Sequence, residues 1–192
     1  MKPLGIAGAW TRDTRVFRDA RGSFRDWYQG GEISADVGRD FVMRQANCVV
    51  SHRGVMRGIH YTQVPPGTAK YFTCVRGTLL SAVVDVRVGS PTFGQWRTVE
   101  LNAADGQALY VAEGLAHGFL SLDDSVLVYA CSTTFNPRHE HGINMLDPEL
   151  GIDWPAGVSP ELSEKDSVAP NLAEAERLGL LPRWVDCPDG QA

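Results

Sequence analysis

Alternating apolar and polar residues recur along most of this chain, a pattern typical of strands with one buried face. Separated by turns rich in Gly, Pro and Asp, these stretches predict strands over residues 11–19, 24–28, 41–51, 54–62, 70–87, 94–101, 107–111 and 125–133. Gly77 predicts a turn or bend within the longest run. Residues 30–39 form a short irregular or helical passage, and residues 171–179 keep helical spacing. The pattern therefore predicts an all-β, double-sheet jelly roll with a short C-terminal helix.

Length and composition point to a single folded unit. A chain of 192 residues can bury one sizeable core, and 43% hydrophobic with 21% charged residues is ordinary for a globular protein. The sequence has no internal repeat, low-complexity segment or linker. We therefore expect residues 1–192 to form one domain.

Charge, hydropathy and cysteine spacing exclude several classes of partner. The net charge of -5 argues against non-specific nucleic-acid binding, although a local basic pocket for phosphates is compatible with it. No apolar run approaches the roughly 20 residues of a membrane helix, and the N-terminus lacks the apolar segment of a secretory signal. The four cysteines are widely spaced, and three lie in strand-like runs, which predicts reduced, buried thiols. We expect a cytoplasmic protein without nucleic-acid or membrane partners.

The candidate chemistry lies around residues 54–70. Strict alternation puts His60 on the face of Met56, near the end of one predicted strand. After a Pro-Pro-Gly turn, Lys70 begins the next strand and shares a face with Phe72. A base and a cation directed into one apolar interior could support proton transfer, because imidazole titrates near neutrality.

A bound metal is not expected. Two histidines separated by one residue on a strand would point both rings inward, but Tyr61 and Thr62 follow His60. A basic imidazole also needs an orienting acceptor, and Asp166, Asp85 and Asp26 are all candidates on this reasoning. The sequence contains no nucleophile motif and no Gly-rich phosphate or dinucleotide loop.

Eight ordered motifs between about residues 17 and 170 carry a resemblance to one family. The motifs are Phe17-x-Asp19-x-Arg21-Gly22, Gln45-x-Asn47, Gly54-Val55-x-Arg57-Gly58-Ile59-His60-Tyr61, Lys70 with Val75-Arg76-Gly77, Asp85-x-Arg87-x-Gly89-Ser90-Pro91-Thr92-Phe93-Gly94, Glu113-Gly114-x-Ala116-His117-Gly118-Phe119 followed by Tyr129, Asp147-Pro148-x-x-Gly151-Ile152-Asp153-Trp154-Pro155, and Leu162-Ser163-x-Lys165-Asp166. Together they resemble the dTDP-4-dehydrorhamnose 3,5-epimerase family, in the branch that serves deoxysugars of bacterial natural products.

The resemblance implies a cupin-like jelly roll, usually a homodimer, that uses neither metal nor cofactor. Its substrates are dTDP-linked 4-keto-6-deoxyhexoses, from which a proton next to the C4 ketone is removed and returned on the opposite face. By matching positions, the resemblance makes His60 the base, Tyr129 the acid and Lys70 the cation at the C4 oxygen. Asp166 becomes the partner of His60.

Further positions match substrate contacts of the family. They are Phe17, Arg21, Asp26, Gln45, Asn47, Arg57, His117, Phe135, Glu140 and Lys165, with Phe17 contributed across the dimer. Arginine and lysine suit a diphosphate. Arg57 and His60 have opposite parity on a regular strand, so both reach one pocket only if the strand bends or bulges, for which Gly58 is the candidate.

Some positions depart from the family pattern. Asp26 replaces a glutamate, Phe135 replaces an aromatic residue that commonly carries a hydroxyl, and residues 144–146 replace a basic-Trp-Asn sequence. These departures leave open whether C3, C5 or both are inverted. Alternatives to the epimerase are a sugar-nucleotide 3,4-ketoisomerase, a catalytically silent sugar-nucleotide-binding cupin and a metal-dependent oxygenase of the same fold.

Overall fold

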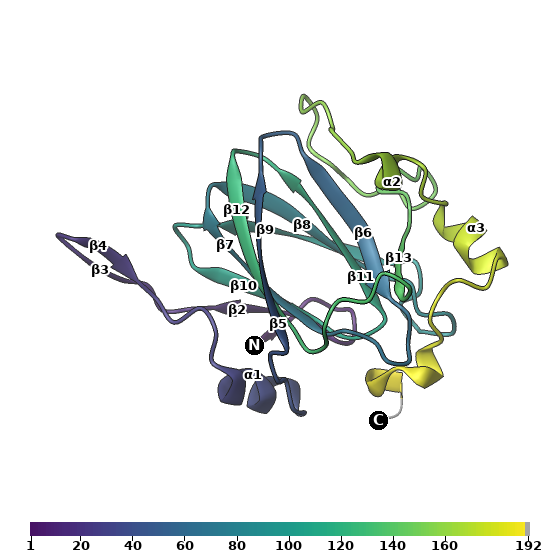
Figure 1. The fold of residues 1–192 in the computed structure, drawn as a ribbon, viewed down its shortest axis with the longest axis horizontal. Helices are drawn as coiled ribbons and strands as arrows, with labels where there is room; N and C mark the ends of the chain where they lie inside the picture. Colours follow the sequence, from purple (N-terminus) through teal and green to yellow (C-terminus); the bar gives the residue numbers. More distant parts are fainter. Residues whose placement is uncertain (191–192) are drawn as a thin grey trace.

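Two antiparallel sheets packed face to face make up the body of the protein in the computed structural model, which describes residues 1–190 (Figure 1). The larger sheet has the strand order β1 (Lys2–Pro3), β2 (Ala9–Asp13), β10 (Gln107–Val111), β7 (Lys70–Arg76), β12 (Ser125–Cys131) and β5 (Gln45–Ser51). The smaller sheet has the order β13 (Glu140–Gly142), β6 (Met56–Thr62), β11 (Leu115–Ser121), β8 (Thr78–Asp85) and β9 (Trp96–Asn102). Most consecutive strands from β5 onward alternate between the two sheets, so the predicted jelly roll is confirmed.

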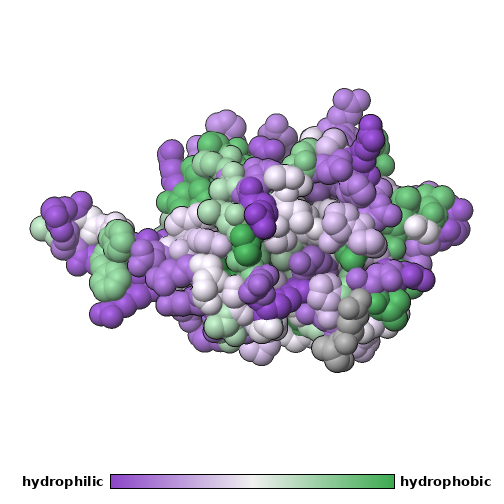
Figure 2. Space-filling model, turned by 60° about the horizontal axis from the view of Figure 1, so that its bottom comes forward, coloured by the Kyte–Doolittle hydropathy of each residue, from purple (hydrophilic) through white to green (hydrophobic). Residues whose placement is uncertain are grey.

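A separate hairpin and several short helices lie outside the two sheets. Strands β3 (Phe17–Asp19) and β4 (Gly22–Phe24) pair only with each other and form a hairpin, the arm, that stands clear of the body (Figure 2). The helices are α1 (Gly30–Val37), α2 (Glu164–Ser167) and α3 (Leu172–Arg177), and 3-10 turns span Trp184–Asp186 and Pro188–Gly190. None of the helices within residues 1–190 is both long and apolar enough to span a membrane.

The smaller sheet is buried on both faces. Leu79 and Val83 of β8 point into the core between the sheets, whereas Ala82 and Val84 point into a second core on the outside. The chain from residue 143 onward supplies the other side of that second core. The C-terminal third is therefore held against β6, β11 and β8, which places α2 beside β6.

Two predicted strands near the N-terminus are wrong in extent. The one predicted over residues 11–19 divides into β2 and β3, because residues 14–16 leave the sheet to form the base of the arm. Of the strand predicted over residues 24–28, only Phe24 lies in a strand, as the last residue of β4. Trp27 and Tyr28 instead pack against Tyr71, which removes them from strand pairing.

Other differences follow from burial. β5 starts at Gln45 and not at residue 41, because Phe41 packs edge-on against Tyr110. β11 was not predicted as a separate strand, since all seven of its residues are buried and a strand covered on both faces shows no alternation. β13 and α2 were also missed, and each is too short to show a period. The turn predicted at Gly77 and the helix predicted within residues 171–179 are present.

The cysteine prediction is correct except at one position. All four thiols are free, and Cys74, Cys131 and Cys187 are buried. Cys48, however, is exposed, because it lies on the outer side of β5, where alternate residues face away from the sandwich.

Candidate active site

A deep opening separates the two sheets at the end formed by β5, β12 and β7 on one side and β6, β11 and β13 on the other. Two adjoining cavities of about 560 and 540 Å³ occupy it. They share five lining residues, which are His60, Lys70, Tyr129, Glu140 and Lys165. All five were predicted as site residues, and they come from β6, β7, β12, β13 and α2.

A bulge in β6 directs two of these side chains inward. His60 pairs with His117 of β11, but Arg57 pairs with Phe119, so β6 has one more residue than its partner between the two pairs. A Cβ on Gly58 would lie 2.6 Å from the Cα of Gly118, so the close approach requires glycine here. The bulge predicted at this residue is therefore present.

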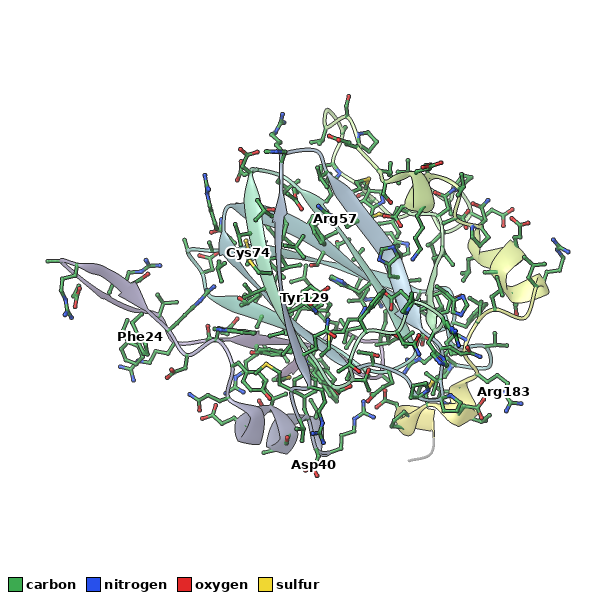
Figure 3. The ribbon with its side chains drawn as sticks, in the orientation of Figure 1. Phe24, Asp40, Arg57, Cys74, Tyr129 and Arg183 are labelled. Atoms are coloured by element: carbon green, nitrogen blue, oxygen red, sulfur yellow. The ribbon has the colours of Figure 1, made fainter. Side chains whose placement is uncertain are left out.

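The bulge also corrects the assigned face of His60. Regular alternation had put His60 with Met56, but Met56, Ile59 and Tyr61 belong to the outer core. His60 and Arg57 are not part of that core, and both line the larger cavity (Figure 3, in which Arg57 is labelled).

The predicted base and its partner are in contact. His60 Nε2 lies 2.6 Å from Asp166 Oδ1, and the Asp166 side chain is nearly buried. Burial would raise the pKa of Asp166, but hydrogen bonds from His60, Ser163 and the backbone of Gly58 outweigh it and lower the pKa below its usual value of 3.8. An ionised carboxylate can only accept, so Nε2 carries the proton and Nδ1 is left as the basic nitrogen.

Of the three carboxylates left open by the sequence, Asp166 is the one that meets His60. Asp85 is fully buried against Arg87 at the far end of β8, and Asp26 lies near Gln29, whose amide is 3.4 Å away. The interval of 106 residues between His60 and Asp166 explains why residue spacing could not rank the three.

Lys70 stands beside Glu140, and both side chains line the two cavities. Its Nζ is 3.6 Å from Glu140 Oε1, and Thr62 donates a hydrogen bond of 3.2 Å to the other carboxylate oxygen. The ammonium thus keeps its hydrogen atoms available to a ligand, because 3.6 Å is too long for a direct hydrogen bond. Thr62 carried no sequence signal for this contact, which depends on the pairing of β13 with β6.

Tyr129 faces His60 from the opposite sheet. It lies on the inner side of β12 with Leu127 and Cys131, as alternation predicted (Figure 3). Its ring packs against Phe72 with 5.2 Å between centroids. Burial raises the pKa of Tyr129 to about 12, so the phenol keeps its proton near neutrality and can donate it.

His117 also lines the first cavity, as a neutral imidazole. Its ring stacks on Phe72 at 4.0 Å, and its Nε2 lies 3.2 Å from the hydroxyl of Ser81. Burial, together with the nearby Lys70 and His60, lowers the pKa of His117 well below 6.5. Ser81 was missed in the sequence, because a lone serine in an apolar strand is not informative.

The remaining predicted contacts divide into three groups, two of which line the cavities. Gln45, Asn47 and Phe135 line the second cavity, where Gln45 accepts a hydrogen bond of 2.8 Å from the Phe135 backbone and donates one of 2.8 Å to Asn47. Arg57, held by a hydrogen bond of 3.1 Å to Ser51, lines the first cavity.

Phe17, Arg21 and Asp26 lie outside both cavities. Phe17 and Arg21 are on the arm, where Arg21 forms an exposed ion pair of 2.6 Å with Asp19. Within one chain the structure therefore does not bring these three residues to the site. Among residues 1–190, no three His, Cys, Asp or Glu side chains are grouped so that they could hold a metal ion.

The arrangement suits a reaction at a carbon next to a ketone. An oriented imidazole on one wall and a protonated phenol on the other address opposite faces of a ring placed between them. Lys70 on β7 and the neutral His117 on β11 also line the first cavity, where they could stabilise a developing enolate oxygen.

Comparison with known proteins agrees with this geometry. The family model described as dTDP-4-dehydrorhamnose 3,5-epimerase matches residues 3–174. A dTDP-4-dehydro-6-deoxyglucose 3-epimerase from a Streptomyces species is 52% identical over 96% of this chain and 94% of its own. A dTDP-4-dehydrorhamnose 3,5-epimerase from Mycolicibacterium smegmatis is 49% identical over 97% of this chain and 92% of its own.

A solved structure extends the similarity to three dimensions. A 3'-monoepimerase from Streptomyces bikiniensis in complex with dTDP-quinovose superposes with a TM-score of 0.94 at 51% identity, covering 97% of this chain and 94% of the other. The resemblance drawn from the sequence motifs is confirmed, and so is the class of enzyme, an isomerase that epimerises sugar nucleotides in deoxysugar biosynthesis. The chain belongs to the dTDP-4-dehydrorhamnose 3,5-epimerase family.

Proposed function

We propose that this enzyme inverts C3 of a dTDP-linked 4-keto-6-deoxyhexose through an enolate, with His60 as base and Tyr129 as acid. The observation that carries the proposal is the His60–Asp166 pair facing the phenol of Tyr129 across one cavity. Similar proteins named 3-epimerases and 3,5-epimerases share C3 as a reacting centre, which favours C3 here. Inversion at C5 is the point on which those relatives differ.

The proposed steps conserve every proton and electron pair. His60 Nδ1 takes the proton from C3, and the C–H electron pair moves into the enolate, whose charge develops on the C4 oxygen beside Lys70. The Tyr129 hydroxyl then delivers its proton to the other face of C3, and the C4 ketone re-forms. Water returns a proton to Tyr129 and accepts the one on His60. A single well-placed donor such as Lys70 would be worth about 3–4 kcal/mol.

The nucleotide would occupy the rest of the opening. Arg57 and Lys165 line the first cavity and supply the positive charge that a diphosphate needs. Gln45, Asn47 and Phe135 offer amide groups and an exposed aromatic ring in the second cavity, which suits a pyrimidine nucleoside. The four free cysteines are compatible with a reducing, cytoplasmic setting.

The direct test is incubation with dTDP-4-keto-6-deoxyglucose in D₂O, with deuterium and configuration at C3 and C5 read by NMR. We expect deuterium and inversion at C3. Label and inversion at C5 as well would make the enzyme a 3,5-epimerase. An absence of deuterium at both carbons would overturn the proposed reaction on this substrate.

We also propose that the enzyme is a homodimer in which the arm of one copy reaches the site of the other. Phe17 and Phe24 on the arm are 46% and 62% exposed and touch neither cavity of their own chain. Val50 on β5, which also lines the first cavity, and Val75 on β7 are exposed as well. An apolar sheet face and an apolar arm of this kind are typical of an interface between copies.

Subunit complementation tests this arrangement. The variants Arg21→Ala and His60→Asn are each expected to be inactive or nearly so, and light scattering should give a dimer for both. If Arg21 serves the partner's site, mixing and refolding the two variants restores activity, because a mixed dimer has one site with both residues intact. If activity does not return in mixed dimers, Arg21 acts within its own chain.

A further inference from the structure

His117 lies close to both the proposed base and the proposed cation. On β11 it pairs directly with His60 of β6, and its ring stacks on Phe72, which is two residues along β7 from Lys70. The His117 side chain is nearly buried, and it lines the first cavity together with His60 and Lys70. A ring nitrogen of His117 that faces this cavity would meet the same part of a substrate as the Lys70 ammonium.

The two ring nitrogens of His117 have different surroundings. Nε2 lies 3.2 Å from the hydroxyl oxygen of Ser81, which is fully buried on the neighbouring strand β8. Nδ1 forms no hydrogen bond with any residue from 1 to 190. Within the same residues, the only buried side-chain nitrogen or oxygen atoms without a hydrogen-bond partner are Nη1 of Arg12 and Nδ1 of His139. His117 Nδ1 is therefore not buried, and it opens to the first cavity.

The hydrogen bond between Ser81 and His117 selects one tautomer of the ring. The Ser81 hydroxyl has one hydrogen, and among the described residues it has no acceptor other than Nε2. If Ser81 accepted from an Nε2–H group, its own hydrogen would be buried without an acceptor, which is costly. If Ser81 donates to Nε2, only lone pairs of its oxygen stay unused. A neutral imidazole that accepts at Nε2 carries its hydrogen on Nδ1.

We propose that Ser81 is a positioning residue that holds His117 in the tautomer with its hydrogen on Nδ1, so that this N–H donates to the C4 oxygen of the substrate beside Lys70. The proposal rests on the proposed function. As the proton leaves C3, negative charge develops on the C4 oxygen, and a donor that is already in place binds the enolate more strongly than the ketone. In the other tautomer, Nδ1 would present a lone pair to the same oxygen and repel it.

Three single variants and one double variant separate this role from a structural one. Ser81→Ala removes the hydroxyl and leaves the His117 ring free to adopt either tautomer. Ser121→Ala is the matched control, because Ser121 is also fully buried, lies on the strand of His117 and bonds the hydroxyl of Ser125 at 2.9 Å, outside both cavities. His117→Asn removes Nε2, so in the double variant Ser81→Ala with His117→Asn there is no ring left for the serine to orient.

Two readouts are measured for these proteins and the wild type. Long-range ¹H–¹⁵N spectra of the histidine rings, with the His117 signals assigned by their loss in His117→Asn, report which nitrogen carries the hydrogen. We expect Nδ1–H in the wild type and in Ser121→Ala, and a gain of Nε2–H in Ser81→Ala. In deuterium exchange at C3, Ser81→Ala should lower kcat about tenfold with KM unchanged, as for one hydrogen bond to a charged group. Ser81→Ala should cause no further loss in the His117→Asn background.

The outcomes that overturn the proposal differ from failure of the proposed function. Hydrogen on Nε2 in the wild type, or the same tautomer in Ser81→Ala as in the wild type, would show that Ser81 does not set the ring. A full additional loss of kcat on adding Ser81→Ala to His117→Asn would show that Ser81 acts through something other than His117. If the wild type itself exchanges no deuterium, the proposed reaction fails, and the ring spectra alone then decide whether Ser81 fixes the tautomer.

Discussion

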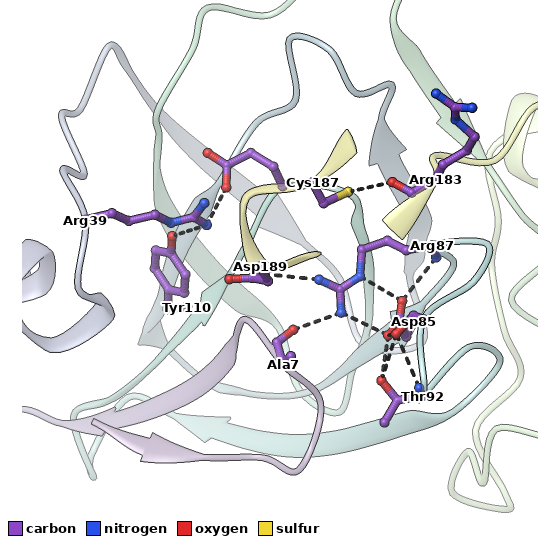
Figure 4. Close-up of polar contacts among 11 residues, drawn as sticks. Ala7, Arg39, Asp85, Arg87, Thr92, Tyr110, Arg183, Cys187 and Asp189 are labelled. Atoms are coloured by element: carbon purple, nitrogen blue, oxygen red, sulfur yellow. Dashed lines mark hydrogen bonds and ion pairs between the residues drawn. The ribbon is translucent and has the colours of Figure 1, made fainter. Parts of the chain in front are cut away.

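Two clusters of charged side chains in this protein are built in opposite ways. The site cluster consists of His60, Asp166, Lys70 and Glu140 in the opening between the sheets. The closed cluster consists of Asp85, Arg87 and Asp189, with Ser90 and Thr92, where β8 meets the C-terminal turns (Figure 4). Both contain ion pairs, but their hydrogen-bonding capacity is used differently.

In the closed cluster the Arg87 guanidinium and the Asp85 carboxylate each hydrogen-bond several protein groups. Arg87 and Asp85 are 0% exposed and form a two-pronged pair with distances of 2.8 and 2.9 Å. Arg87 also donates to Asp189 and to the carbonyl of Ala7, and its guanidinium lies over the ring of Trp184. Ser90 and Thr92 each donate to Asp85 at 2.6 Å.

The closed cluster joins the N-terminal loop, the end of β8 and the C-terminal turns. In the site cluster, by contrast, the side chain of His60 is 27% exposed and the Lys70 ammonium stands 3.6 Å from its carboxylate. Hydrogen-bonding capacity is left for a substrate. Ion pairing alone therefore does not mark a functional charge. An open side toward a cavity distinguishes the site cluster from the closed cluster.

The largest expected effect is on the site cluster. Replacing His60→Asn removes the base, which should lower the rate of C3 proton exchange by about 10³-fold or more, while the thermal unfolding midpoint stays close to that of the wild type. His141→Asn is the control, because His141 stacks on Tyr61 on the outer side of the same sheet. Exchange assays and calorimetry check the pair, and a His60 variant that retains exchange would remove this residue from the mechanism.

A substitution in the closed cluster should instead lower the stability of the fold and leave the activity unchanged. Arg87→Met leaves the buried Asp85 carboxylate without its cation and should lower the free energy of unfolding by about 3–5 kcal/mol. At a temperature where the variant remains folded, kcat should be unchanged. Denaturant unfolding and steady-state assays measure the two quantities, with the exposed Arg97→Met as control. Lost activity without lost stability would break the distinction between the clusters.

A smaller effect on the free energy of unfolding is expected at acid pH. Burial alone would raise the pKa of Asp85, but hydrogen bonds and charge from Arg87, with hydrogen bonds from Ser90 and Thr92, lower it below 3.8. A carboxyl whose pKa is lower in the folded state stabilises the fold above its unfolded pKa and loses that contribution as pH falls through the folded value.

The free energy of unfolding should therefore decline as pH falls below about 4. The decline should be shallower in Arg87→Met, where the cation that lowers the pKa is missing. Denaturant titrations from pH 7 to pH 3 measure both slopes. Equal slopes in the two proteins would show that Arg87 does not set the ionisation of Asp85.

Much of the site could be predicted because it depends on local alternation and on ordered motifs. The inward positions of Lys70 and Tyr129 follow from period-two spacing in β7 and β12, and the structure places both in the cavities. The jelly roll follows from the same alternation. Asp166 was recovered through the family motif only, since its contact with His60 joins residues 106 positions apart in the sequence.

The remainder depends on features that spacing does not encode. One extra residue at the β6 bulge reverses the face of His60 relative to Met56, and only the register with β11 reveals it. The contacts made by Thr62 and Ser81 need the neighbouring strands to be in place. Asp85 is a structural carboxylate because it is buried against Arg87, and residue spacing does not encode this burial.

The most direct test of the account concerns the opposite placement of base and acid. Tyr129→Phe removes the phenol but leaves His60 free to take a proton and return one on the same face. On dTDP-4-keto-6-deoxyglucose in D₂O we expect deuterium at C3 with retention of configuration, and inversion slowed by about 10²-fold or more relative to exchange. Inversion at the wild-type rate in this variant would contradict the assignment of Tyr129 as the acid. It would also contradict the placement of base and acid on opposite sides of the cavity.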